Sequence, residues 1–157
     1  MRNTTSPTIQ NLEAAFAGES MAHIKYLWFA RQCRKAGDEA TARVFEDTAA
    51  QEMLHAFGHA ELLFADETMT PARCLRYAID GETHEYTEMY PRFRHEAMIE
   101  GNTAAVAEID GQIVESKEHA EMFKSVLEKA ARRFAALARV EEKHAKHYQA
   151  QRDAIAA

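Results

Sequence analysis

A fifteen-residue repeat is the feature that most restricts the possible folds of this 157-residue chain. Residues 42–56 read ARVFEDTAAQEMLHA and residues 131–145 read ARRFAALARVEEKHA, with identical residues at seven of fifteen positions. A shorter pair, LEAAFAGES at 12–20 and LRYAIDGET at 75–83, shares Leu, Ala, Gly and Glu in register. Internal repetition indicates that one supersecondary unit occurs twice. The chain is therefore predicted to contain two similar helix pairs.

Turn-forming residues are few, and they mark the expected ends of the first two helices. The chain has 6 Gly and 3 Pro, and its long stretches of Ala, Glu, Lys, Leu and Met favour helices over strands. Ser6–Pro7 predicts a helix start, and Gly37 predicts its end. Asp38 predicts the start of a second helix that ends near residue 65. Residues 66–70 then form a connection.

The second half of the chain is expected to hold two longer helical stretches. Thr70–Pro71 predicts a helix that runs to Gly101–Asn102, with a kink at Pro91. From residue 103 to about 153 the pattern is again helical, interrupted at Asp110–Gly111. An unbroken helix of that length would greatly overrun the first two, so we expect a bend, a hairpin or a separate short helix within it. The predicted class is all-α, a four-helix bundle in one domain over residues 1–157, with an extended or extra helical segment around 103–130.

Composition and charge exclude several classes of protein. Acidic residues outnumber basic ones 25 to 19, and the Lys and Arg are scattered, so a nucleic-acid partner is not expected. Cys33 and Cys74 lie apart and outside any CxxC, which argues against a disulfide framework, a zinc ribbon and an iron–sulfur knuckle. No apolar run approaches the ~18 residues of a membrane span, and the N-terminus lacks an apolar signal segment. We expect a soluble, cytoplasmic protein with no membrane partner.

One glutamate and one histidine lie a helical turn apart in each copy of the longer repeat. Glu52 and His55 have E-x-x-H spacing, and so have Glu141 and His144. Residues three apart share one side of a helix, so each pair can direct both side chains to one point of a bundle core. A single E-x-x-H in a Glu-rich helix is usually a solvated pair, but two copies inside a repeat favour a common role in metal binding.

The shorter repeat adds one glutamate to each helix pair. Glu19 and Glu82 each follow a glycine, whose missing side chain lets a neighbouring helix approach closely. One Glu from each of two helices, with E-x-x-H from each of two others, is the ligand pattern of dinuclear metal sites in helix bundles. Carboxylates and imidazoles suit iron or manganese better than metals that prefer thiolates. The sequence therefore predicts a site for two such ions.

A second assignment of the fourth-helix ligands remains open. Glu19 and Glu52 are 33 residues apart, and the same step from Glu82 leads to Glu115, one turn before His119. Residues 105–120 share little with 42–56, however, and Ser116 stands where E-x-x-H needs a Glu. The pair Glu141 and His144 is therefore favoured, and Glu115 with His119 is the alternative.

The sequence resembles the rubrerythrins, a family of ferritin-like di-iron proteins. The segments that carry the resemblance are AFAGES at 15–20, QEMLHA at 51–56, GETHEYTEMYP at 81–91 and RFAALARVEEKHAKHY at 133–148. The metal ligands that it implies are Glu19, Glu52, His55, Glu82, Glu85, Glu141 and His144. It further implies roles beside the metals for Tyr26 and Tyr90. Buried carboxylates in this number need compensating charge, which two divalent ions nearly supply.

The resemblance implies a non-haem di-iron peroxidase that reduces hydrogen peroxide to water in defence against oxidative stress. In this family one iron is held by the histidine equivalent to His55 when reduced and by the carboxylate equivalent to Glu85 when oxidised. Manganese is possible at one or both positions. The four cysteines of a rubredoxin-like domain are absent from this sequence, so electrons are expected from an external rubredoxin-like protein or flavoprotein. A homodimer is expected.

Two other classes of function are compatible with the same residues. The same ligands would oxidise Fe²⁺ with oxygen in a ferroxidase or iron-handling protein, for which a many-subunit shell would be typical. A metal-free helical interaction module is the third possibility, and it predicts no iron in protein purified from iron-replete cells.

Overall fold

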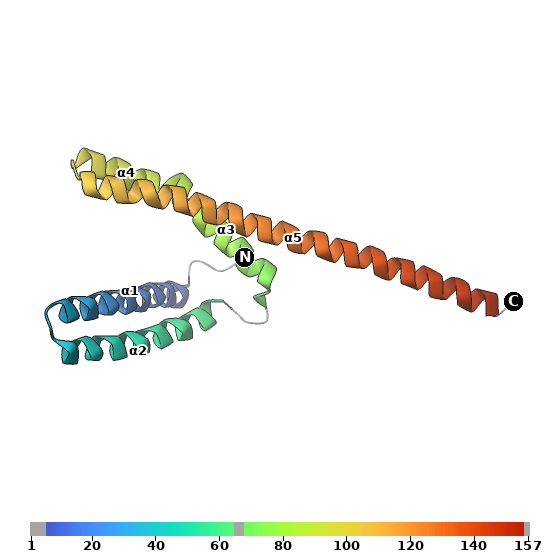
Figure 1. The fold of residues 1–157 in the computed structure, drawn as a ribbon, viewed down its shortest axis with the longest axis horizontal. Coiled ribbons are helices and arrows are strands. Elements are labelled where there is room, and N and C mark those ends of the chain that lie inside the picture. The colour runs from blue at the N-terminus through green and yellow to red at the C-terminus, as the bar shows by residue number, and fades with distance from the viewer. Residues whose placement is uncertain (1–5, 65–67, 156–157) are drawn as a thin grey trace. The chain divides into compact units, whose positions relative to one another are not determined.

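The computed structural model describes residues 6–64 and 68–155, and this part of the chain contains helices and turns but no strand (Figure 1). The elements are α1 (Pro7–Lys35), α2 (Glu39–Leu63), α3 (Pro71–His84), the π-helical segment η2 (Glu85–Met89), α4 (Tyr90–Ile99) and α5 (Thr103–Ile155). They form two compact units, Met1–Met69 and Thr70–Ala157. The predicted all-α class is confirmed, whereas the single domain over 1–157 stays a prediction.

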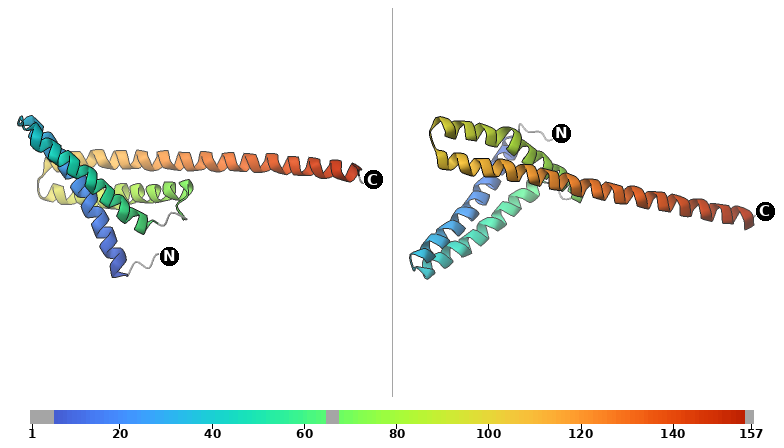
Figure 2. Two further views of the ribbon diagram at one scale, coloured as in Figure 1. Left: turned by 90° about the horizontal axis from the view of Figure 1, so that it is seen from below. Right: turned by 45° about the horizontal axis from the view of Figure 1, so that its top comes forward.

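In the first unit, α1 and α2 lie side by side as an antiparallel pair (Figures 1 and 2). Gly37 adopts a φ of +83° in the connection, a conformation that glycine takes without the steric cost of a side chain. The Asp38 side chain accepts a hydrogen bond from the Thr41 amide at 2.9 Å and so caps α2. The predicted end of α1 and start of α2 are confirmed. The predicted end of α2 near residue 65 and residues 66–67 of the expected connection lie outside the described residues.

A seam of small side chains joins the two helices. Ala42, Ala49, Ala56 and Leu63 recur every seven residues along α2, and all four are buried. Ala30 is the buried residue of α1. A seven-residue repeat keeps one stripe of a helix against its neighbour, and alanine lets the two backbones approach closely. This close approach brings the polar side chains beside the seam within reach of one another.

In the second unit, α3, η2 and α4 run in succession along one side of α5 (Figures 1 and 2). Thr70 caps α3 by accepting from the Arg73 amide, and Pro71 occupies the first turn, as predicted. The irregularity expected at Pro91 is present as the π-helical segment directly before it, in which the Tyr90 amide donates to the Glu85 carbonyl. Proline has no amide proton to continue the regular ladder. π-Helical segments are frequently found at functional sites, and this one begins at Glu85.

The last helix, α5, is unbroken over 53 residues, so the interruption predicted at Asp110–Gly111 is wrong. Asp110 accepts hydrogen bonds from Arg94 of α4 at 2.5 and 3.2 Å, which stabilises α5 at this point. A glycine inside a helix costs only about 1 kcal/mol relative to alanine, less than packing of this length provides. The residues that were expected to bend away therefore lengthen a single helix.

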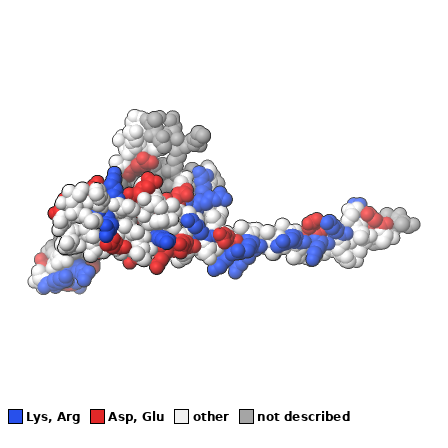
Figure 3. Space-filling view, turned by 90° about the horizontal axis from the view of Figure 1, so that it is seen from above, with Lys and Arg blue, Asp and Glu red and all other residues white. Residues whose placement is uncertain are grey.

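The C-terminal part of α5 extends beyond the helices that pack against it (Figure 2). Every side chain described from residue 131 to 154 is exposed. Lys and Arg outnumber Asp and Glu by six to three over 131–155, and Figure 3 shows both kinds along this projecting part. Lys146 lies 2.5 Å from Glu142, four residues earlier, a pairing typical of a solvated helix. None of the described helices has the length and apolar character that a bilayer span requires.

Candidate metal centre

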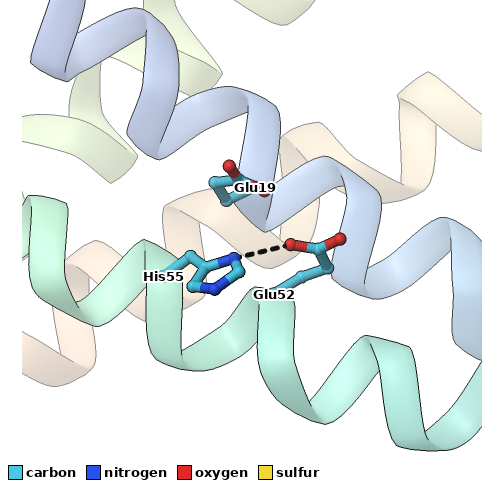
Figure 4. A group of neighbouring side chains, drawn as sticks. All are labelled: Glu19, Glu52 and His55. Atoms are coloured by element: carbon cyan, nitrogen blue, oxygen red, sulfur yellow. Dashed lines mark hydrogen bonds and ion pairs between the residues drawn. The ribbon is translucent and has the colours of Figure 1, made fainter.

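Three potential ligands converge between α1 and α2, and we call them the α1–α2 cluster. Glu19 from α1 and Glu52 and His55 from α2 each offer one ligand atom, and these atoms lie within 4.8 Å of one another (Figure 4). The E-x-x-H spacing places Glu52 and His55 on one side of α2, and the alanine seam brings that side to Glu19. The structure therefore brings together three of the predicted ligands.

The arrangement of this cluster suits a hard metal ion. His55 Nδ1 lies 2.9 Å from Glu52 Oε2, and the Glu52 side chain is only 17% exposed. Glu19 is half-buried. Two carboxylates at this separation repel each other unless a cation or a proton lies between them. The donor set of two carboxylates and one imidazole is one that iron and manganese favour.

Neighbouring residues fix the two helices and leave an apolar cavity beside the cluster. His23 of α1 hydrogen-bonds through Nδ1 to the Ala49 carbonyl of α2 at 2.7 Å. A cavity of about 320 Å³ lies next to this bond. Its lining residues are Phe16, Ser20, His23, Ile24, Met53, Ala56 and Phe57. Ser20 and Ala56 follow Glu19 and His55 in the sequence, so the cavity lies along the same part of the α1–α2 pair as the cluster, although no cluster residue lines it.

A second set of polar side chains meets between α5 and the helical path α3–η2, and we call it the α3–α5 cluster. His119 Nδ1 of α5 lies 3.5 Å from Glu82 Oε1 of α3. Ser116 Oγ of α5 donates a hydrogen bond to Glu85 Oε2 at 2.9 Å. Glu82 and Glu85 lie one turn apart and are both half-buried, as predicted for residues that share an inward direction.

The two predicted tyrosines have different surroundings. Tyr90 is half-buried directly after η2, and burial raises the pKa of its hydroxyl, with the negative charges of Glu85, Glu82 and Glu108 adding to the effect. Tyr90 is therefore electrostatically coupled to the α3–α5 cluster. Tyr26 lies two turns after Glu19 on α1, where its ring packs 5.9 Å from the ring of Phe45.

The structure does not bring Glu141 and His144 to Glu82. Both lie on the projecting part of α5, where their side chains are 75% and 57% exposed and pair with each other at 3.8 Å. The alternative pair is realised in part, because His119 reaches Glu82 whereas Glu115 is exposed. In the ligand set proposed below, His119 accordingly takes the place of Glu141 and His144.

Ser116 is the residue whose importance the sequence did not indicate. It is 3% exposed and contacts Glu85. It lies three residues before His119, so S-x-x-H in α5 has the spacing of E-x-x-H in α2. The S-x-x-H spacing was the available signal, but it does not match a motif that requires a glutamate at the first position.

Comparisons with known proteins find relatives that share much of this sequence. Nigerythrin of Nitratidesulfovibrio vulgaris is 37% identical over 135 residues, covering 78% of this chain and 66% of that protein. Rubrerythrin of Porphyromonas gingivalis is 39% identical over 107 residues, covering 61% and 54%. A structure of fully reduced, all-ferrous nigerythrin is 31% identical, covers 83% of this chain and 70% of that one, and has a TM-score of 0.41.

The chain matches only 54 to 66% of the length of nigerythrin and of this rubrerythrin. The family model described as Rubrerythrin matches residues 10–127. That range includes both clusters and ends before Glu141. Because the match covers well over half of the sequence, the chain belongs to the rubrerythrin family, and the ferritin-like class predicted from the sequence is confirmed.

Proposed function

We propose that this protein is a non-haem di-iron peroxidase that reduces hydrogen peroxide to water with electrons from an external donor. The observation that carries the proposal is the convergence of Glu19, Glu52 and His55 within 4.8 Å. Family membership supports iron as the metal.

The residues present fit two divalent ions. The proposed ligands are Glu19, Glu52 and His55 of the α1–α2 cluster and Glu82, Glu85 and His119 of the α3–α5 cluster. The four carboxylates carry as much negative charge as two divalent ions carry positive charge, so each charge is compensated when the ions are bound. The donors are hard oxygens and imidazoles, with no thiolate, which favours iron and allows manganese.

Two ferrous ions would supply the two electrons that, with two protons, convert one hydrogen peroxide into two waters. Glu85 offers a carboxylate oxygen and His55 an imidazole nitrogen, and an oxygen ligand of this kind suits the more positive ferric state better. The Tyr90 hydroxyl is protonated at neutral pH, as an ordinary tyrosine is, and can donate a hydrogen bond beside the α3–α5 cluster; its raised pKa extends this to higher pH. Tyr26 of α1 is proposed to have a role beside the metal ion at the α1–α2 cluster, without being a ligand.

The surroundings of the site are part of the proposal. The apolar cavity between α1 and α2, lined by residues that include Ser20 and Ala56, has room for a small oxidant such as hydrogen peroxide. Electrons would come from a rubredoxin-like protein or a flavoprotein, and the protein would act as a cytoplasmic homodimer in oxidative-stress defence.

Anaerobic stopped-flow mixing tests the proposal. The iron-loaded, reduced protein is mixed with hydrogen peroxide and, separately, with oxygen, and oxidation is followed by absorbance. Faster oxidation by peroxide supports the peroxidase. Faster oxidation by oxygen, together with release of ferric product, would instead identify a ferroxidase. Protein that takes up no iron under anaerobic loading would refute both functions and leave the metal-free module.

A matched pair of variants ties the result to the cluster. Glu52→Gln removes a ligand charge, so iron content and peroxide oxidation should both fall. Glu61→Gln changes an exposed glutamate of the same helix and should leave both unchanged. Equal iron content in the two variants would show that the α1–α2 cluster does not hold metal.

A further inference from the structure

Ser116 is the one buried polar side chain among the residues that the structure describes, and it lies in the α3–α5 cluster. It precedes His119 by three residues, as Glu52 precedes His55 in the α1–α2 cluster. Because this spacing is common to both helices, Ser116 and Glu52 occupy equivalent positions relative to their histidines. The two clusters therefore differ at this position by a neutral hydroxyl in place of a carboxylate.

The hydrogen-bond partner of the Ser116 hydroxyl is Glu85. Its Oγ donates to Glu85 Oε2 at 2.9 Å, a good length for a charge-assisted hydrogen bond. At its other end Glu85 is fixed by the π-helical turn, in which its carbonyl accepts from the Tyr90 amide. The carboxylate of Glu85 is thus restrained by α5 as well as by its own backbone.

We propose that Ser116 is a positioning residue that holds one oxygen of Glu85 and so presets this carboxylate for a metal ion at the α3–α5 cluster. The inference rests on the proposed function and concerns a residue of this chain that contributes no charge. Hydrogen bonds to the groups that ligate a metal fix their orientation, and their loss typically weakens metal binding by about 10- to 100-fold.

The hydroxyl also limits the negative charge of this cluster. A glutamate at position 116 would add a third carboxylate beside Glu82 and Glu85, in a position that is 3% exposed. Like charges in a poorly solvated place destabilise the fold unless a cation compensates them. Serine avoids this cost in the metal-free protein, while a glutamate would increase the dependence of stability on metal.

Anaerobic Fe²⁺ titration of the full-length protein by calorimetry tests the inference in wild type, Ser116→Ala and Ser125→Ala. Ser125 lies on the same helix, nine residues further on, and serves as the matched control. We expect Ser116→Ala to bind one ion with wild-type affinity and the other about 10- to 100-fold more weakly. Ser125→Ala should bind both as the wild type does. A purely structural role for Ser116 would lower thermal stability without this selective loss.

Ser116→Glu provides a second measurement that does not depend on activity. The melting temperature of its metal-free form should fall below that of Ser116→Ala, and added Fe²⁺ should raise it by more than in the wild type. If the wild type binds two ions and Ser116→Ala binds them identically, the inference is wrong and the proposed function stands. If the wild type binds none, the proposed function fails and the inference with it.

Discussion

His119 Nδ1 lies 3.5 Å from Glu82 Oε1, so the imidazole that reaches the glutamate of α3 comes from the first third of α5 and not from its projecting end. We predict that His119→Ala loses about one of two bound irons, because a metal-ligating imidazole has no replacement in its vicinity. His144→Ala should keep both, since His144 is exposed and pairs only with Glu141 among the described residues. Iron content after anaerobic loading checks this prediction.

Glu141→Ala and Glu115→Ala complete this comparison. Glu141 pairs with His144 on the projecting part of α5, and Glu115 belongs to neither cluster, so both variants should retain iron and peroxide oxidation. Loss of iron in Glu141→Ala or His144→Ala would restore the repeat at 131–145 as part of the site.

Glu85→Ala should separate metal binding from reactivity. Loaded with excess Fe²⁺, the variant should still hold two irons because Glu82 and His119 remain, although the ion at the α3–α5 cluster should bind more weakly, as in Ser116→Ala. It should react with peroxide about 10- to 100-fold more slowly. The reason is that the ferric state would lose the carboxylate of Glu85, whereas the imidazole of His119 would remain for the ferrous state. Stopped-flow rates with peroxide and with oxygen measure the effect. Unchanged rates and an unchanged preference between the oxidants would make Glu85 an ordinary residue of the helix.

Stability should depend on metal. Glu19 and Glu52 are brought together with His55, and their charges repel when no cation is present. We expect added Fe²⁺ to raise the melting temperature at neutral pH and chelation to reverse the rise, because an ion that binds only the folded state stabilises it. Glu52→Gln should make the Fe²⁺-dependent rise in melting temperature smaller, whereas Glu61→Gln should leave it unchanged. Identical melting curves with and without metal would count against the proposed site.

Helix ends were predictable wherever a single residue decides them. Gly37, with its positive φ, and Asp38, with its bond to the Thr41 amide, are local signals, and the structure follows both. The continuity of α5 was not predictable in this way. Asp110, which the sequence suggested as an interruption, instead pairs with Arg94, which is sixteen residues away and belongs to another helix.

The same distinction explains which site residues the sequence revealed. Glu52 and His55 belong to one helical turn, so their spacing alone predicted that they act together. The partner of Glu82 depends on the register between α3 and α5, which side-chain packing sets. Ser116 also breaks the E-x-x-H motif at that register, so the repeat at 131–145 gave the stronger motif although the structure brings His119 to Glu82.

Tyr90 should have a pKa above the ordinary value of a tyrosine. Burial disfavours its charged form, and Glu85, Glu82 and Glu108 oppose a further negative charge, so its pKa is raised above the ordinary value of 10.0. The folded state binds this proton more tightly than the unfolded state, so the stabilising contribution is complete below pH 10.0 and is lost as the pH rises through the folded-state pKa. Ultraviolet difference titration at high pH measures ionisation. Tyr90→Phe should remove the ionisation step that lies above the ordinary range, whereas Tyr148→Phe, at an exposed position, should leave that step in place.

Arg34 should make the stability of the α1–α2 pair depend on pH, with the stabilisation lost at acidic pH. It pairs with Glu39 at 3.0 Å and with Glu46 of α2, and these bonds lower the pKa of both carboxyls. A lowered folded-state pKa contributes stability that is present above the ordinary pKa of a glutamate and is lost as the pH falls through the folded-state values. We therefore predict that Arg34→Gln lowers the melting temperature at pH 7 by roughly 2 °C, and that the difference from wild type narrows toward pH 3. Arg31→Gln, an exposed change on the same helix, is the control and should show no such pH dependence. A deficit in Arg34→Gln that stays constant from pH 7 to pH 3 would mean that Arg34 stabilises the helices by packing and not through these two ion pairs.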